Sequence, residues 1–67
     1  MKDIINELEL LKEIFEATII NRDKTFAESS EKWQESKKGD EWGNITARLA
    51  GMRDKISDWH KELIEYL

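Results

Sequence analysis

Residues 42–66, WGNITARLAGMRDKISDWHKELIEY, decide the fold of this chain. Large apolar side chains recur there at alternating steps of three and four residues, which places them along one side of an α-helix. A strict stripe of this kind is typical of a coiled-coil seam, which has to pack against another helix. The stripe consists of Trp42, Ile45, Leu49, Met52, Ile56, Trp59, Leu63 and Tyr66.

The composition indicates one small helical domain that spans residues 1–67. The chain contains no proline and no cysteine, and 39% of its residues are charged. A chain of this length buries only about 60% of its unfolded surface, so its stability is marginal without help. That help is not a disulfide, because cysteine is absent. We therefore expect association with another chain.

Helix boundaries follow from the one segment that favours a turn, residues 37–40, KKGD. We expect a first helix over about residues 2–37, a turn at residues 38–40 and a second helix over about residues 41–66. The predicted fold class is all-α, a two-helix antiparallel hairpin.

Four residues of this segment have predicted roles at the helix ends. Gly39 is expected to take the left-handed conformation just past the first helix. Lys37 and Lys38 would lie in the last turn of that helix, where cations complement exposed carbonyls. Asp40 would cap the start of the second helix.

The first predicted helix carries a less regular apolar stripe, which keeps its period only if Arg22 and Ser30 are counted as members. Arg22 then either lies at the edge of the seam with its charged group in water, or belongs to a buried polar pair that fixes the register between subunits. The seam residues that we predict from both helices are Ile4, Leu8, Leu11, Phe15, Ile19, Ile45, Leu49, Met52, Ile56, Trp59 and Leu63.

A second apolar surface on the first helix predicts self-association. Leu10, Ile14 and Ala17 lie well away from the seam when each residue is advanced by roughly 100°. An isolated hairpin would expose this patch, and exposed apolar patches usually mark contact surfaces. The simplest arrangement is a homodimer in which two hairpins form a four-helix bundle. A higher oligomer, another partner protein and a monomer are the alternatives.

Small residues form the face of the second helix opposite its stripe. Gly43, Ala47 and Gly51 follow one another at steps of four residues. Each glycine inside a helix costs about 1 kcal/mol relative to alanine. This face therefore either allows close approach of another helix or a ligand, or is simply solvated.

Trp33 and Trp42 flank the predicted turn, close to Lys32, Lys37 and Lys38. Together they could form a small site for an anion or a nucleotide. Nearby acidic residues balance these lysines, and the alternative is that the two indoles pack on each other across the turn. The partner or ligand face that we predict comprises Leu10, Ile14, Ala17, Gly43, Ala47, Gly51, Trp33 and Trp42.

The sequence carries no pattern that supports catalysis or metal binding. His60 is the only histidine, and there is no cysteine with which it could share a metal ion. No serine or threonine has a plausible base partner. We therefore expect a protein that is not an enzyme and that uses no metal and no cofactor.

Acidic residues around the turn resemble, faintly, the paired motifs of all-α nucleoside triphosphate pyrophosphohydrolases, whose carboxylates hold magnesium. Ala27 and Asn44 stand where that pattern has acidic residues, and the chain is too short for the usual four helices. This resemblance is therefore set aside. The residues concerned are Glu28, Glu31, Glu41 and Asn44.

Residues 30–39, SEKWQESKKG, resemble a segment of the form S-E-K-W-Q-E-S-x-K-G in small uncharacterised helical proteins of phages and bacteria. The resemblance covers only this part of the chain and implies no established activity. It does imply a phage origin, and small phage proteins are often inhibitors or sequestering agents of host systems.

We expect a non-catalytic, self-associating interaction module, a small regulator or inhibitor that binds a protein partner. An oligomer that binds or sequesters a nucleotide is the alternative. A minor alternative is RNA binding, because the architecture resembles the acidic hairpin dimer of plasmid copy-number control. Arg48 and Arg53 do not share a face, however, and the net charge of −4 disfavours nucleic acid. No apolar run approaches the roughly 20 residues of a membrane span, so we expect a cytoplasmic protein without membrane contact.

Overall fold

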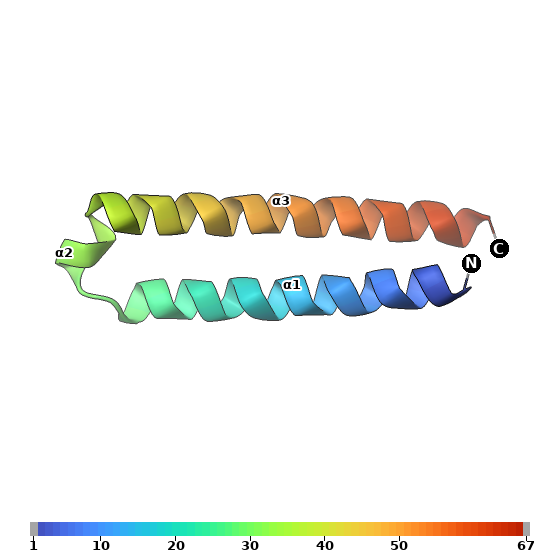
Figure 1. Ribbon diagram of the computed structural model, residues 1–67, viewed down its shortest axis with the longest axis horizontal. Helices are drawn as coiled ribbons and strands as arrows, with labels where there is room; N and C mark the ends of the chain where they lie inside the picture. The colour runs from blue at the N-terminus through green and yellow to red at the C-terminus, as the bar shows by residue number, and fades with distance from the viewer. Residues whose placement is uncertain (1, 67) are drawn as a thin grey trace.

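The computed structural model describes residues 2–66 and folds them into two long α-helices with a one-turn helix between them (Figure 1). The helices are α1 (Lys2–Glu28), α2 (Glu31–Gln34) and α3 (Lys37–Glu65). α1 and α3 lie side by side and run in opposite directions, with both chain ends at one end of the pair and α2 at the other (Figure 1). The predicted all-α class is confirmed.

The first long helix ends at Glu28, whereas the sequence predicted an end near residue 37. Two serines explain the difference, because a serine hydroxyl competes for backbone hydrogen bonds and favours helix ends. The Ser29 hydroxyl donates to the Thr25 carbonyl oxygen at 2.7 Å. Ser30 takes an extended backbone, and its side chain accepts the N–H of Trp33 as the N-cap of α2. Ser30 is thus a cap and not a stripe position.

The second long helix is capped by Ser36 and not by Asp40 as predicted. The Ser36 hydroxyl accepts the N–H of Gly39 at 3.2 Å, so Gly39 lies inside the first turn of α3. No glycine of residues 2–66 has a positive φ. Glycine is needed at position 39 for another reason, because a Cβ there would collide with the carbonyl oxygen of Trp33. The predicted turn and the predicted roles of Gly39 and Asp40 are wrong.

A glutamine amide, and not a lysine, reaches carbonyl oxygens at the end of α1. Gln34 Nε2 donates to the carbonyl oxygens of Phe26 at 2.7 Å and Ser29 at 3.0 Å. These bonds replace the intrahelical partners that the end of a helix lacks. Lys37 and Lys38, predicted to lie at this end, begin α3 instead.

The core between α1 and α3 is thin. Ile5, Ile19 and Ile56 are the only buried hydrophobic residues of the part of the chain that the structure describes. Most of the buried and half-buried residues of both helices recur at steps of three and four, and we call this row the inner seam. The inner seam consists of Ile5, Leu8, Lys12, Phe15, Ile19, Arg22 and Phe26 in α1, and of Trp42, Thr46, Leu49, Arg53, Ile56, His60 and Leu63 in α3.

The inner seam of α3 is rotated relative to the stripe predicted from the sequence. The two share every seventh residue from Trp42 onward, but between these positions the inner seam uses Thr46, Arg53 and His60. Thr46 faces α1 because its hydroxyl accepts a hydrogen bond from Arg22. Four apolar residues of the predicted stripe are left outside, namely Ile45 (50% exposed), Met52 (51%), Trp59 (53%) and Tyr66 (76%).

Candidate interaction surfaces

Arg22 joins the two long helices near the connection. Its Nε donates to Thr46 Oγ1 at 2.9 Å, and its Nη2 donates to the Trp42 carbonyl oxygen at 3.2 Å. The guanidinium carbon lies 3.8 Å from the centroid of the Trp42 ring. In return, Trp42 Nε1 donates to the Arg22 carbonyl oxygen at 3.1 Å. We call Arg22, Trp42 and Thr46 the arginine cluster.

The arginine cluster differs from both interpretations of Arg22 made from the sequence. Its charged group is stacked on an indole, and its hydrogen bonds join the two long helices of one chain. Charge-assisted hydrogen bonds and cation–π contacts are directional. The cluster therefore fixes the register of α1 against α3.

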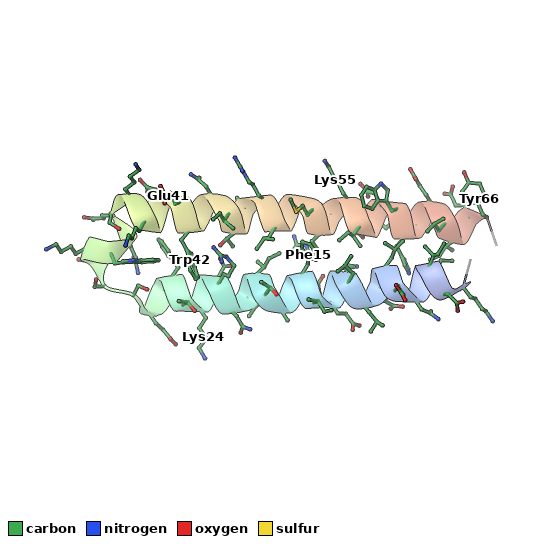
Figure 2. All side chains as sticks on the ribbon, in the orientation of Figure 1. Phe15, Lys24, Glu41, Trp42, Lys55 and Tyr66 are labelled. Atoms are coloured by element: carbon green, nitrogen blue, oxygen red, sulfur yellow. The ribbon has the colours of Figure 1, made fainter. Side chains whose placement is uncertain are left out.

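Aromatic rings close the connection end of the helix pair. The centroid of the Trp33 ring lies 5.9 Å from that of Trp42 and 5.9 Å from that of Phe26, and both contacts are edge-to-face. Such pairs contribute about 0.5–1.5 kcal/mol beyond the area that they bury. Figure 2 shows Trp42 between the two long helices. The expected packing of Trp33 on Trp42 is confirmed.

A shallow groove of about 480 Å³ lies at this end, beside the residues of the predicted anion site. Trp42 does not line it, because its ring is enclosed in the arginine cluster. Both serine hydroxyls of the groove already cap helices. The lining residues are Ser30, Lys32, Trp33, Ser36, Lys37 and Lys38.

Part of the predicted small-residue face lines a second groove, of about 410 Å³. Gly43 and Ala47 contribute to its wall, together with Asp23 and Phe26 from α1. Gly51 does not line it. A Cβ at Gly43 or at Gly51 would meet no atom within 4 Å, so the chain's own packing does not require glycine at either position.

One broad face of the helix pair carries two rows of residues next to the inner seam. Two antiparallel helices are related by an approximate twofold axis normal to their broad face. Equivalent rows of the two helices therefore fall on the same face. The rows in question lie one residue before every second seam residue, which means before Ile5 and its heptad equivalents in α1 and before Thr46 and its heptad equivalents in α3. We call these two rows the apolar face. It consists of Ile4, Leu11, Thr18 and Thr25 from α1 and of Ile45, Met52, Trp59 and Tyr66 from α3.

The large side chains of the apolar face are strongly exposed. Their exposed fractions run from 40% at Leu11 to 76% at Tyr66. Figure 2 shows Tyr66 directed away from α1. The eleven predicted seam residues thus divide into a buried pair, Ile19 and Ile56, a half-buried set, Leu8, Phe15, Leu49 and Leu63, and an exposed set, Ile4, Leu11, Ile45, Met52 and Trp59.

The second apolar patch of α1 adjoins this face. Leu10 and Ile14 are 59% and 61% exposed, and Ala17 is exposed as well. A hollow of about 410 Å³ connects Leu10 and Ile14 with Ile4 and Leu11 of the apolar face. The two α1 surfaces that the sequence placed on separate sides are therefore one continuous apolar surface over the first half of the helix.

Polar members of the inner seam were missed from the sequence. Lys12, Arg53 and His60 hold seam positions although none of them is apolar. His60 Nε2 is buried and has no hydrogen-bond partner in the described part of the chain. The available signal was their spacing, because each lies at a step of three or four from an apolar seam residue.

Among residues 2–66, no three or more histidine, cysteine, aspartate or glutamate side chains are placed to hold a metal ion. No helix in this range combines the length and the apolar character that crossing a membrane requires. A scan of protein-family models, a search of curated proteins and a search of solved structures each find no match to this chain.

Proposed function

We propose that this protein is a non-catalytic interaction module that self-associates through its apolar face, so that two helical hairpins form a four-helix bundle. The observation that supports this is the apolar face itself, with six large side chains at steps of seven residues along two helices. A soluble monomer rarely exposes a contiguous apolar patch of more than a few hundred Å².

The thin core gives the chain a reason to associate. Only three hydrophobic residues of the described chain are buried, and the sequence has no cysteine for a disulfide. Small domains of this kind usually gain stability from a disulfide, a metal or oligomerisation. Covering the exposed half of an isoleucine or methionine side chain stabilises by roughly 1 kcal/mol. A second copy would cover the six large apolar or aromatic side chains of this face on each chain.

The proposed role is that of a small regulator or inhibitor that binds a protein partner. Once the apolar face is covered, two surfaces remain for this purpose. One is the patch of Leu10 and Ile14 on the outer side of α1, and the other is the groove beside Gly43 and Ala47.

Two matched substitutions test the use of the apolar face. Met52 lies on this face and Ile20 lies outside it, and they are 51% and 65% exposed. Each is replaced by glutamate, and the molar mass is measured by light scattering coupled to size exclusion. We expect Met52→Glu to give a monomer because it places charges in the interface, whereas Ile20→Glu should remain a dimer. Equal masses for the two variants would contradict the proposal.

Nucleotide binding is a second candidate, favoured by the groove that gathers Trp33 with Lys32, Lys37 and Lys38. An aromatic ring beside several cations can hold a base and its phosphates. Calorimetric titration with a panel of nucleotides tests it. The candidate predicts a saturable heat that is lost in the double variant Lys37→Gln with Lys38→Gln, and an absence of heat for the unmodified protein would remove it.

A further inference from the structure

We infer that the two copies pack in the same direction, with both connections at one end of the bundle and the chain ends at the other. This inference rests on the proposed self-association and adds the orientation of the second copy. It follows from the distribution of side chains along the apolar face and from the size of that face.

Apolar side chains are concentrated at one end of the apolar face. The hydrogen bond from Arg22 to Thr46 sets the levels of the two helices, so that Leu11 and Trp59 lie near each other along the long axis. Met52 lies near the middle. The half nearest the chain ends carries Ile4, Leu11, Trp59 and Tyr66, and the half nearest α2 carries Thr18, Thr25 and Ile45.

We call the half nearest α2 the threonine half, and covering Thr25 in it costs little. The Thr25 hydroxyl donates to the Asn21 carbonyl oxygen of its own helix at 2.9 Å. Burying a hydroxyl that is hydrogen-bonded within its own helix costs less free energy than burying one without a hydrogen-bond partner. The threonine half therefore suits a second threonine half, which buries methyl groups from both sides.

The size of the face favours overlap along its whole length. The Cα atoms extend over 51 Å by 15 Å on the broad side, so the outline of this side has an area of about 765 Å². A stable interface of standard size buries about 800 Å² on each partner. An arrangement in which only half of the face is covered would bury about half of that, which is the range of weak contacts.

Only one arrangement of the two copies both matches like halves of the apolar face and overlaps along its whole length. Two copies in opposite directions with full overlap would place the apolar half of each on the threonine half of the other. Opposite copies shifted to match their apolar halves would lose about half of the buried area. Copies in the same direction match apolar with apolar and threonine with threonine over the full length.

The parallel arrangement has a defined contact pattern. A twofold axis along the bundle places α1 of each copy beside α3 of the partner, so that every pair of neighbouring helices is antiparallel, as in up-down bundles. Because Leu11 and Trp59 share a level in one chain, Leu11 packs near Trp59 of the partner subunit. Ile4 in the same way lies near Tyr66 of the partner subunit.

Pulsed dipolar spectroscopy on spin-labelled chains tests the orientation. The chain has no cysteine, so Glu35→Cys and Glu65→Cys each give one label per copy, the first beside the connection and the second at the chain ends. Both positions are exposed. Dilution with an excess of unlabelled chain is the control, since it removes distances between copies.

For the same direction we expect both variants to give distances below about 30 Å, because neighbouring helices pack roughly 10 Å apart. A distance near 51 Å or longer for Glu35→Cys would overturn the inferred orientation while leaving self-association intact. A lack of any distance between copies, together with a monomeric mass of the unlabelled chain, would overturn the orientation and the proposed function together.

Discussion

Arg22 occupies a seam position that is held by Phe15 and Leu8 at the two preceding steps of seven residues in α1. It is tolerated there because its polar groups find partners on α3, namely the Thr46 hydroxyl and the Trp42 carbonyl, while its plane lies over an indole. These contacts are tertiary and cannot be read from the spacing of α1 alone. This is why the sequence left the role of Arg22 open and missed Thr46 as its partner.

Replacing Arg22 by alanine tests the structural role of the arginine cluster. Arg22→Ala removes two hydrogen bonds from a charged donor and the contact with Trp42, so we expect the free energy of unfolding to fall by about 2 kcal/mol. The measurement is urea unfolding at one fixed protein concentration, because association also contributes to stability. Arg48→Ala, at an exposed position of α3, is the control and should change stability by less than about 0.5 kcal/mol. Similar losses in both variants would count against the cluster.

Serines mark the end of α1 and the start of α3, because their hydroxyls take part in backbone hydrogen bonds there. Ser30 caps α2 and Ser36 caps α3, so that the connection spans residues 29–36 and not the three residues predicted around Gly39. The existence of both long helices was predictable, because their periodicity extends over many residues. The two helix ends at the connection were not, because no glycine or proline marks the break after Glu28.

Gly39 and Gly51 should respond in opposite ways to the same substitution. Both lie within α3, but a Cβ at Gly39 would collide with the Trp33 carbonyl, whereas one at Gly51 would meet no atom within 4 Å. We expect Gly51→Ala to stabilise the protein by about 1 kcal/mol through helix propensity. Gly39→Ala should destabilise it by roughly 1–3 kcal/mol, because backbone must move. Thermal unfolding of the two variants checks this, and stabilisation by Gly39→Ala would show that the connection is not packed as described.

The inner seam of α3 is rotated about the helix axis relative to the predicted stripe. For this reason the sequence did not predict that part of the stripe would form an exposed apolar surface. The sequence predicted that one stripe of α3 would close mostly against α1. In the structure every second member of that stripe remains outside, because Thr46, Arg53 and His60 take the inner positions. Spacing alone could not separate the two choices, since both keep steps of three and four residues. The one polar pairing across the two helices that favours the observed choice is the hydrogen bond from Arg22 to Thr46.

The molecule as a whole is a slab 51 Å long with unlike broad sides. One side carries the apolar face, and the other carries the groove beside Asp23 and Gly43. A thin core and one large apolar side are what a half of a bundle would present before its other half is added. The proposal of a regulator follows from this asymmetry, because covering one side leaves the other available to a partner.

Sedimentation equilibrium of the unmodified chain at micromolar concentration tests the central claim most directly. The chain has a mass of 8.0 kDa, and self-association through the apolar face predicts a species of twice that mass. It also predicts that the thermal unfolding temperature rises with protein concentration, as it does for other oligomers. A mass of 8.0 kDa throughout the micromolar range, from a chain that is folded, would contradict the account.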